Sequence, residues 1–207
     1  MSSLHNPAAF FDAIRRGGLL GTLDQGEVDG INNMLTEFGR ANWPIAYAAY
    51  GLATAFHETA GKMQPVREIG NVAYFTRMYD ITGARPDVAR RLGNAHPGDG
   101  ARYYGRGLPQ TTGLTNYQKA AAFLGVDCVA NPDLLLNPDT AARWMVHAME
   151  IGLFTGRKIS DDLPQSGLAD WHQFVVTRDV VNGHDKEQEI ATEAVSFQGA
   201  LQQGGWA

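Results

Sequence analysis

The feature that most constrains the fold is a long irregular stretch between two groups of predicted helices. From residue 62 to about residue 113 the sequence is rich in Gly, Pro, Asn, Arg and Tyr. Only short helical pieces are predicted in it, near Val72–Tyr79 and Pro86–Leu92. A stretch of this length without a strong period usually carries function when it lies inside a compact domain. We therefore expect helices that flank a cleft, with the central region lining the cleft.

Helix-start signals and apolar spacing predict helices on both sides of this stretch. Asn6 precedes a proline and opens the first helix, and Asp24 and Glu27 have capping-box spacing at the start of the second. Helices resume after residue 113. At 207 residues the chain can bury one sizeable core, and it shows no internal repeat or linker. The sequence therefore predicts a single mainly α domain over residues 1–207, with at most a small β-hairpin.

The charge balance argues against nucleic acid as a partner. The net charge is −5 at pH 7, so the chain lacks the global basic field that nucleic-acid binding usually needs. Several arginines are close in sequence and could form a local basic patch, but we interpret them as solvated surface residues. They are Arg85, Arg90, Arg91, Arg102 and Arg106.

The cysteine content and the hydropathy bear on the compartment. Cys128 is the only cysteine, so no internal disulfide can form, which fits a reducing compartment. No stretch approaches the roughly 18 apolar residues of a membrane helix, and the first residues lack a signal-peptide pattern. We expect a protein made in the cytoplasm, without membrane insertion, that reaches any target outside the cytoplasm through another factor.

The first candidate for chemistry is Glu58, a carboxylate in the last turn of a mostly apolar helix. The C-terminal end of a helix carries partial negative charge, which disfavours an ionised carboxylate, and partial burial acts in the same direction. A general acid needs this tendency to keep its proton near neutral pH. The alternative interpretation is a solvated glutamate at a helix end.

A second carboxylate, Glu68, follows ten residues later. Gly61 can reverse the chain and Pro65 can stiffen its return, which would bring Glu68 back across a cleft. Glycoside hydrolysis uses such a pair, one carboxylic acid that protonates the departing oxygen and one carboxylate that orients water. Two glutamates at this spacing are common, so the pair alone is weakly informative.

The third element is the segment from residue 103 to residue 117. Its glycines permit close backbone approach, its neutral polar side chains suit water and sugar hydroxyl or acetamide groups, and its paired tyrosines could stack on sugar faces. The glycines are Gly105 and Gly107, the tyrosines Tyr103 and Tyr104, and the polar residues Gln110, Thr112 and Asn116. An ordinary turn and ordinary core packing are the alternatives.

Taken in order, these segments resemble family 19 chitinases and the related phage endolysins of the lysozyme-like superfamily. The resemblance covers nearly the whole chain. It rests on His57-Glu58-Thr59, Glu68, Gly105-Arg106-Gly107-x-x-Gln110-x-Thr112-Gly113-x-x-Asn116-Tyr117 and Thr177-Arg178-Asp179-Val180-Val181-Asn182-Gly183. The chain has His184 where the family usually has a second Gly, and Thr112 where chitinases usually have Ser.

The resemblance implies a lysozyme-like α+β fold and an inverting glycoside hydrolase that needs no metal or organic cofactor. It places Glu58 at the family's general acid and Glu68 at its general base. It places Thr112, with Gln110, near the attacking water, so Thr112 joins the expected catalytic set. The expected substrate-binding set is His57, Tyr104, Arg106, Gln110, Asn116 and Asn182.

Two other chemistries find little support. A zinc peptidase of the HExxH type needs a second histidine four residues after His57, and Gly61 stands there. Nucleophilic catalysis by Cys128 is not indicated either, since its neighbours predict a small core residue at a helix exit.

The resemblance leaves the substrate open. We expect glycan strands of bacterial peptidoglycan, because the compact layout and the single cysteine are similar to endolysins, and we expect a monomer. The alternatives are a chitinase acting on chitin oligomers and a non-catalytic glycan-binding module of a wall or virion.

Overall fold

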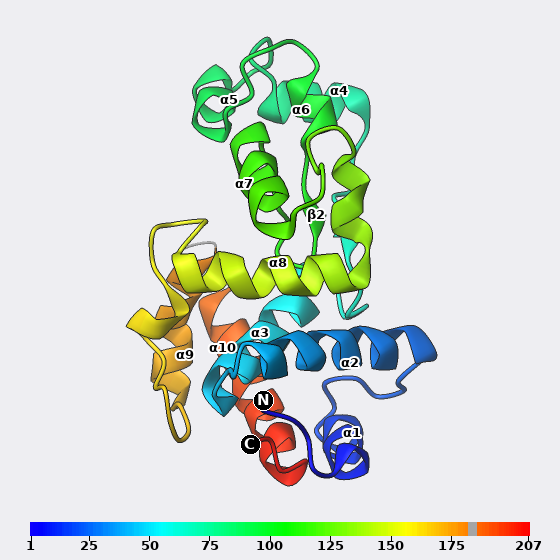
Figure 1. Ribbon diagram of the computed structural model, residues 1–207, viewed down its shortest axis with the longest axis vertical. Helices are drawn as coiled ribbons and strands as arrows, with labels where there is room; N and C mark the ends of the chain where they lie inside the picture. The colour runs from blue at the N-terminus through cyan, green and yellow to red at the C-terminus, as the bar shows by residue number, and fades with distance from the viewer. Residues whose placement is uncertain (182–185) are drawn as a thin grey trace. The chain divides into compact units, whose positions relative to one another are not determined.

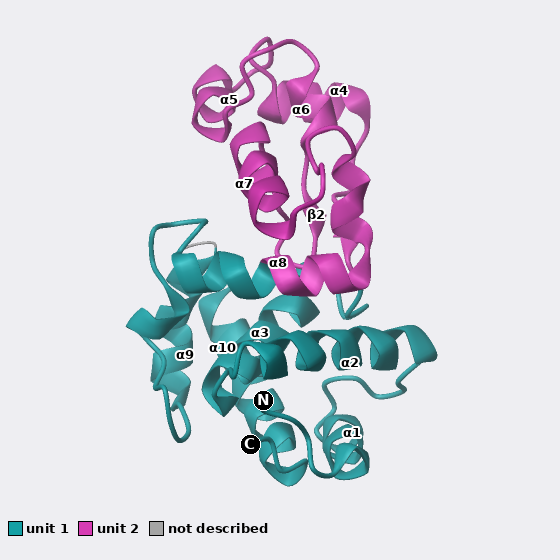
Figure 2. Ribbon diagram, in the orientation of Figure 1, with its two compact units in different colours: residues 1–64, 145–207 teal, residues 65–144 magenta. Residues whose placement is uncertain are grey.

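The computed structural model describes residues 1–181 and 186–207 and is mostly helical (Figure 1). The chain divides into two compact units, unit 1 with residues 1–64 and 145–207 and unit 2 with residues 65–144 (Figure 2). The small amount of strand and the many helices confirm the expected mainly α class. A single domain over residues 1–207 stays a prediction. Within the described ranges, no helix is long and apolar enough to cross a membrane.

Unit 1 is built around two helices that pack on each other, α3 (Ile45–Glu58) and α10 (Glu187–Gln203). Residues 46–55 of α3 are all buried, as expected for a helix that is apolar on nearly every side. The other elements of unit 1 are α1 (Pro7–Arg16), α2 (Gln25–Arg40), the second half of α8 (Pro138–Ile151), η2 (Ile159–Asp161), α9 (Trp171–Thr177) and η3 (Arg178–Val180).

The first two helices begin where the sequence predicts. The side chain of Asn6 accepts a hydrogen bond from the backbone N–H of Ala9 at 3.1 Å, which satisfies a donor at the start of α1. Asp24 and Glu27 form the complete capping box of α2, with reciprocal hydrogen bonds of 2.8 and 2.9 Å. Both predicted starts are therefore confirmed.

The end of α3 is stabilised by the side chain of Thr59. The Thr59 hydroxyl donates to the carbonyl of Ala55 at 2.7 Å and accepts from the backbone N–H of Met63 at 2.9 Å. Ala60, at φ +50°, is the first left-handed residue after the helix, and Gly61 follows at φ +82° and donates its backbone N–H to the carbonyl of Phe56 at 2.8 Å. These contacts fix the final turn of α3, which carries Glu58.

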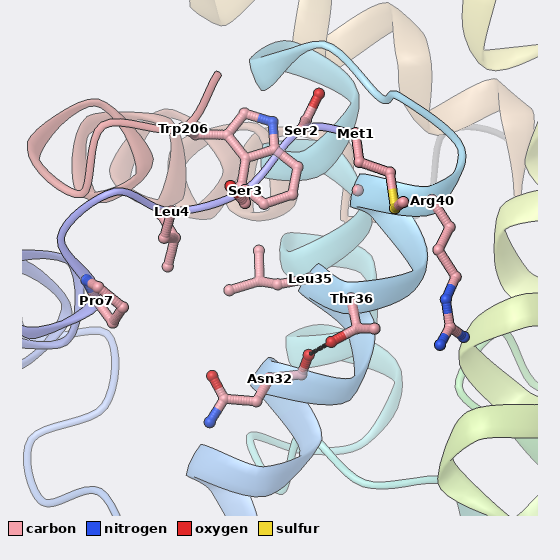
Figure 3. Close-up of a pocket in the computed structure, with 11 residues that line it drawn as sticks. Met1, Ser2, Ser3, Leu4, Pro7, Asn32, Leu35, Thr36, Arg40 and Trp206 are labelled. Carbon is pink, nitrogen blue, oxygen red and sulfur yellow. Dashed lines mark hydrogen bonds between the residues drawn. The ribbon is translucent and has the colours of Figure 1, made fainter.

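The chain termini pack on α2 and line an open cavity of about 690 Å³ (Figure 3). Leu4 forms a β-bridge with Trp206, and the indole N–H of Trp206 donates to the carbonyl of Trp43 at 3.0 Å. Gly39 of α2 allows the close approach, because a Cβ there would lie 2.2 Å from the carbonyl oxygen of Ser2. The cavity lining is mainly apolar and contains no carboxylate among the described residues, so it is not the candidate active site.

Unit 2 holds most of the irregular stretch. Its elements are β1 (Val66–Arg67), α4 (Val72–Tyr79), α5 (Pro86–Leu92), α6 (Asp99–Arg102), β2 (Arg106–Gly107), α7 (Leu114–Leu124), η1 (Pro132–Leu136) and the first half of α8. The two short helices predicted inside the stretch are confirmed with the expected bounds. The one-turn helix α6 was not predicted.

The only sheet of the described residues is a two-stranded antiparallel ladder with Val66 opposite Gly107 and Arg67 opposite Arg106. A small hairpin was the most that the sequence led us to expect. The ladder differs from a hairpin because its strands are separated by three helices and not by a tight turn. Two residues per strand leave no period-two pattern to detect, which is why the pairing escapes sequence reasoning.

Candidate active site

The expected site residues fall into two groups, one in each unit. Unit 1 carries His57 and Glu58, and unit 2 carries Glu68 and the segment from residue 103 to residue 117. Each group has its own supporting contacts. Asn182, expected to bind substrate, lies outside the described residues.

Glu58 is the last residue of α3, and its carboxylate is paired with a buried arginine. Its Oε1 accepts a hydrogen bond from Nη2 of Arg178 at 3.1 Å. The Glu58 side chain is 17% exposed, whereas that of Arg178 is 1% exposed. The hydrogen bond to a buried guanidinium fixes the orientation of the Glu58 carboxyl group. Arg178 is therefore part of the candidate site, although we assigned it no role from the sequence.

The pKa values of the groups around Arg178 show how much of this region is buried. Burial raises the pKa of Tyr50 to about 12, and the charge of Arg178 opposes the rise. Burial also raises the pKa of Glu193 to about 7, with Glu189 adding to the shift. Burial lowers the pKa of His57, against the opposing charge of Glu58. His57 therefore stands next to the candidate acid as a neutral side chain near pH 7.

Glu68, just after β1, is held at both carboxylate oxygens. Oε1 accepts a hydrogen bond from the Tyr79 hydroxyl at 2.8 Å, and Oε2 accepts one from the backbone N–H of Gly105 at 3.1 Å. The backbone N–H of Glu68 donates to the carbonyl of Gly105 at 2.8 Å. A carboxylate with two donors has a fixed plane and retains lone pairs for a further partner, as a general base requires.

Gly105 is required at its position because two oxygens crowd its Cα. A Cβ there would lie 2.8 Å from Oε1 of Gln110 and 3.0 Å from Oε2 of Glu68. The absence of a side chain therefore lets both acceptors approach the same point of the backbone. The structure brings Glu68 and Gln110 together, as the resemblance implies.

Gln110 and the residues after it form a chain of side-chain to backbone hydrogen bonds. The amide group of Gln110 donates to the carbonyls of Val66 and Gly107 at 3.2 and 3.0 Å, which leaves its Oε1 as the free acceptor beside Glu68. Thr112 donates from its hydroxyl to the carbonyl of Gln110 at 3.1 Å, and the Asn116 amide donates to the carbonyl of Thr112 at 2.9 Å. Gln110 has φ +51°, a conformation rare for residues other than glycine. Such strain is common at functional sites.

Tyr104 and Arg106 have structural roles. The Tyr104 ring stacks on Phe75, with centroids 4.1 Å apart and an interplanar angle of 3°. The Arg106 guanidinium lies 3.7 Å from the centroid of the same ring. Because two groups this close cannot share one face, both faces of Tyr104 are covered. The expectation that this ring stacks on a sugar is therefore corrected.

Arg106 is 6% exposed and donates hydrogen bonds from Nε and Nη1. Its guanidinium donates to Asp133 at 2.8 Å and to the hydroxyl of Tyr117 at 3.0 Å, as well as to two backbone carbonyls. The hydroxyl of Tyr117 donates in turn to the carbonyl of Tyr104 at 2.8 Å. Arg106 thus holds the loop in place, and its expected role in substrate binding stays a prediction.

Other reactive groups of the described residues give no second centre. No group of three His, Cys, Asp or Glu side chains arranged to hold a metal is found in residues 1–181 and 186–207. Cys128 is fully buried, and burial raises the pKa of its thiol. The prediction of a core cysteine is confirmed.

Comparison with known proteins identifies the fold. The structure is similar to that of chitinase C from Streptomyces griseus HUT6037, with a TM-score of 0.56 and 19% sequence identity over 96% of this chain and 78% of that one. The crystal structure of a bacterial family 19 chitinase gives a TM-score of 0.53 and 19% identity over 94% of this chain and 93% of that one. The chain has the fold of the family 19 chitinases.

Sequence similarity to a curated chitinase covers only a short segment of the chain. A segment of 33 residues is 61% identical to Chitinase 8 of Oryza sativa subsp. japonica, and it spans 16% of this chain and 13% of the rice protein. No family model matches the chain. The family 19 fold thus rests on structure over almost the whole chain and on sequence over a short segment.

Proposed function

We propose that this protein is a glycoside hydrolase that cleaves β-1,4 bonds of N-acetylated glycans, with bacterial peptidoglycan as its substrate, by an inverting mechanism. The observation that carries the proposal is the fixed carboxylate of Glu68, which has a donor on each oxygen and the free acceptor of Gln110 beside it. Two acceptors aimed at one region suit a water molecule that donates to both. The family 19 fold supports this interpretation.

In the proposed reaction, protonated Glu58 gives its proton to the glycosidic oxygen as the bond to the anomeric carbon breaks. Water attacks that carbon from the opposite face and loses a proton to Glu68. Glu58 is then a carboxylate, and the adjacent guanidinium of Arg178 stabilises the charge that the transfer creates. Both carboxyl groups return to their starting states by proton exchange with solvent.

Chitin is the alternative substrate, because the similar proteins named above are chitinases. Both polymers are β-1,4-linked and N-acetylated, so the same carboxylates could serve either. We favour peptidoglycan on the resemblance of the compact, cysteine-poor sequence to endolysins.

The test is digestion of purified peptidoglycan and of chitin, with mass spectrometry of the products. We expect soluble fragments from peptidoglycan, and their reducing-end sugar identifies the bond that is cut. Early NMR spectra should show the α-anomer, because inversion of a β-linkage produces it. Release from chitin alone would select the alternative substrate.

Two variants connect the activity to the carboxylates. Glu58→Gln and Glu68→Gln should each lower kcat by at least about 100-fold while the protein stays folded. Binding of glycan without hydrolysis by the unmodified protein would show a binding module and would refute the proposal. Full activity of Glu58→Gln would remove that residue from the mechanism.

A further inference from the structure

Glu68 owes its orientation to two donors of different kinds. The first is the backbone N–H of Gly105, which no substitution can delete except proline. The second is the hydroxyl of Tyr79, at 2.8 Å from Oε1. The Tyr79 contact is thus the only hydrogen bond from a side chain to Glu68 among the described residues. Deleting the hydroxyl oxygen of Tyr79 removes it.

Tyr79 is held from its own backbone. It is the last residue of α4, and its carbonyl accepts a hydrogen bond from the side-chain amide of Asn94 at 2.9 Å. Asn94 is fully buried, and its Oδ1 accepts from the backbone N–H of Leu114 at 2.9 Å. Since Leu114 begins α7, one buried amide joins the end of α4 to the start of the helix that carries Asn116.

The residue after Tyr79 supplies a second anchor. The buried carboxylate of Asp80 accepts from the backbone and hydroxyl of Thr82 at one oxygen, and from the backbone N–H groups of Gly98 and Gly100 at the other. Burial alone would raise the pKa of Asp80, but these hydrogen bonds hold it below its ordinary value. A Cβ on Gly100 would lie 2.6 Å from the backbone nitrogen of Asp80, so the chain here is tightly packed.

We propose that Tyr79 is a positioning residue for Glu68, and that Asn94 sets the place from which Tyr79 donates. The inference rests on the proposed role of Glu68 as the base. Tyr79 fixes the carboxylate from Oε1, and Oε2, the oxygen beside Gly105 and Gln110, is the one that faces the attacking water and takes its proton in this scheme. Tyr79 touches neither water nor substrate in this scheme.

The ionisation of Tyr79 agrees with this role. Burial raises the pKa of its hydroxyl, and the hydrogen bond to Glu68 raises it further. The phenol therefore keeps its single proton throughout the neutral range and can only donate it to the carboxylate.

The test compares Tyr79→Phe with Tyr74→Phe. Both substitutions delete one phenolic oxygen from α4, but the Tyr74 hydroxyl has no hydrogen bond among the described residues. For Tyr79→Phe we expect kcat to fall by about 10- to 100-fold, since a hydrogen bond to a charged group is lost. KM should change little, and the acidic limb of the kcat/KM profile should move to higher pH. Tyr74→Phe should leave all three unchanged.

A second measurement works without any glycan. The side-chain carboxyl carbon of Glu68 is followed by NMR during a pH titration of the unmodified protein and of Tyr79→Phe. The titration midpoint should rise in the variant, and an unchanged midpoint would overturn the inference. If Glu68→Gln kept full activity, the proposed function would fail. If Glu68→Gln were inactive and Tyr79→Phe unaltered in kcat and pH profile, the positioning role alone would fail.

Discussion

Arg178 is almost completely buried and donates from its guanidinium to Oε1 of Glu58 at 3.1 Å. The pair joins η3 to the last residue of α3, so it combines a structural contact with a partner for the proposed acid. Removing one partner of a buried ion pair leaves the other charge uncompensated, which destabilises the protein. The pair can therefore be tested by substitution.

Arg178→Met should destabilise the protein and lower its activity. The free energy of unfolding should fall by about 3 kcal/mol, because Glu58 loses its partner and the site loses its hydrogen bonds. Urea denaturation measures this change. Arg15→Met is the control, since Arg15 forms an exposed ion pair with Asp12 and should cost less than about 1 kcal/mol. Equal losses for the two variants would contradict the importance of the buried pair.

Gly105→Ala should reduce turnover more than it reduces stability. The added Cβ would enter the space between Gln110 and Glu68 and push at least one of the two oxygens away. We expect kcat to fall by about 10-fold or more, as for other small displacements in active sites. Gly199→Ala is the matched control, because nothing lies within 4 Å of a Cβ there. That substitution in α10 should be neutral or stabilise the protein by up to about 1 kcal/mol.

Thr112→Val should slow the reaction because it deletes the hydroxyl that donates to the carbonyl of Gln110. Without that contact, Gln110 is less firmly held in its strained conformation at φ +51°. Steady-state kinetics should show a lower kcat, by about 5- to 10-fold for a neutral hydrogen bond. Thr112→Ser retains the hydroxyl and should restore the rate. If the valine variant were as fast as the unmodified protein, Thr112 would have no part in holding Gln110.

Glu193 should make stability depend on pH. Burial raises its pKa from 4.5 to about 7, so the folded chain binds the proton more tightly than the unfolded chain does. Its contribution to the free energy of unfolding is full below about pH 4.5 and is lost as the pH rises towards 7. Denaturation at several pH values should show this decline in the unmodified protein and a flatter profile in Glu193→Gln. Asp87→Asn, at a highly exposed position, should leave the profile unchanged, and parallel profiles for all three proteins would rule the effect out.

Local signals in the sequence are sufficient to predict several helices and their ends. The caps at Asn6 and Asp24 act within one turn of their helices, and the two short helices of the irregular stretch have their predicted bounds. Glu68 and Gln110 also lie together, as the order of the motifs implied. These successes share a cause, since short-range hydrogen bonds and motif order can both be read along one chain.

The sequence does not predict the orientation of several side chains or the residues that they contact. Tyr104 and Arg106 carry the right chemistry for sugars, but the pattern of residues does not reveal that Phe75 covers one ring face and the guanidinium the other. The Arg178 and Tyr79 contacts are of the same type, because each joins residues from separate elements. Only a three-dimensional arrangement discloses such partners.

The ladder between β1 and β2 also has a consequence for how the protein acquires its chemistry. Glu68 and its backbone partner Gly105 are separated in the sequence by α4, α5 and α6, so their pairing closes a long loop. Closing so large a loop is slow relative to forming a helix. We therefore expect the proposed base to be assembled late in the folding of its unit, and heating to stop the reaction before most helices unfold.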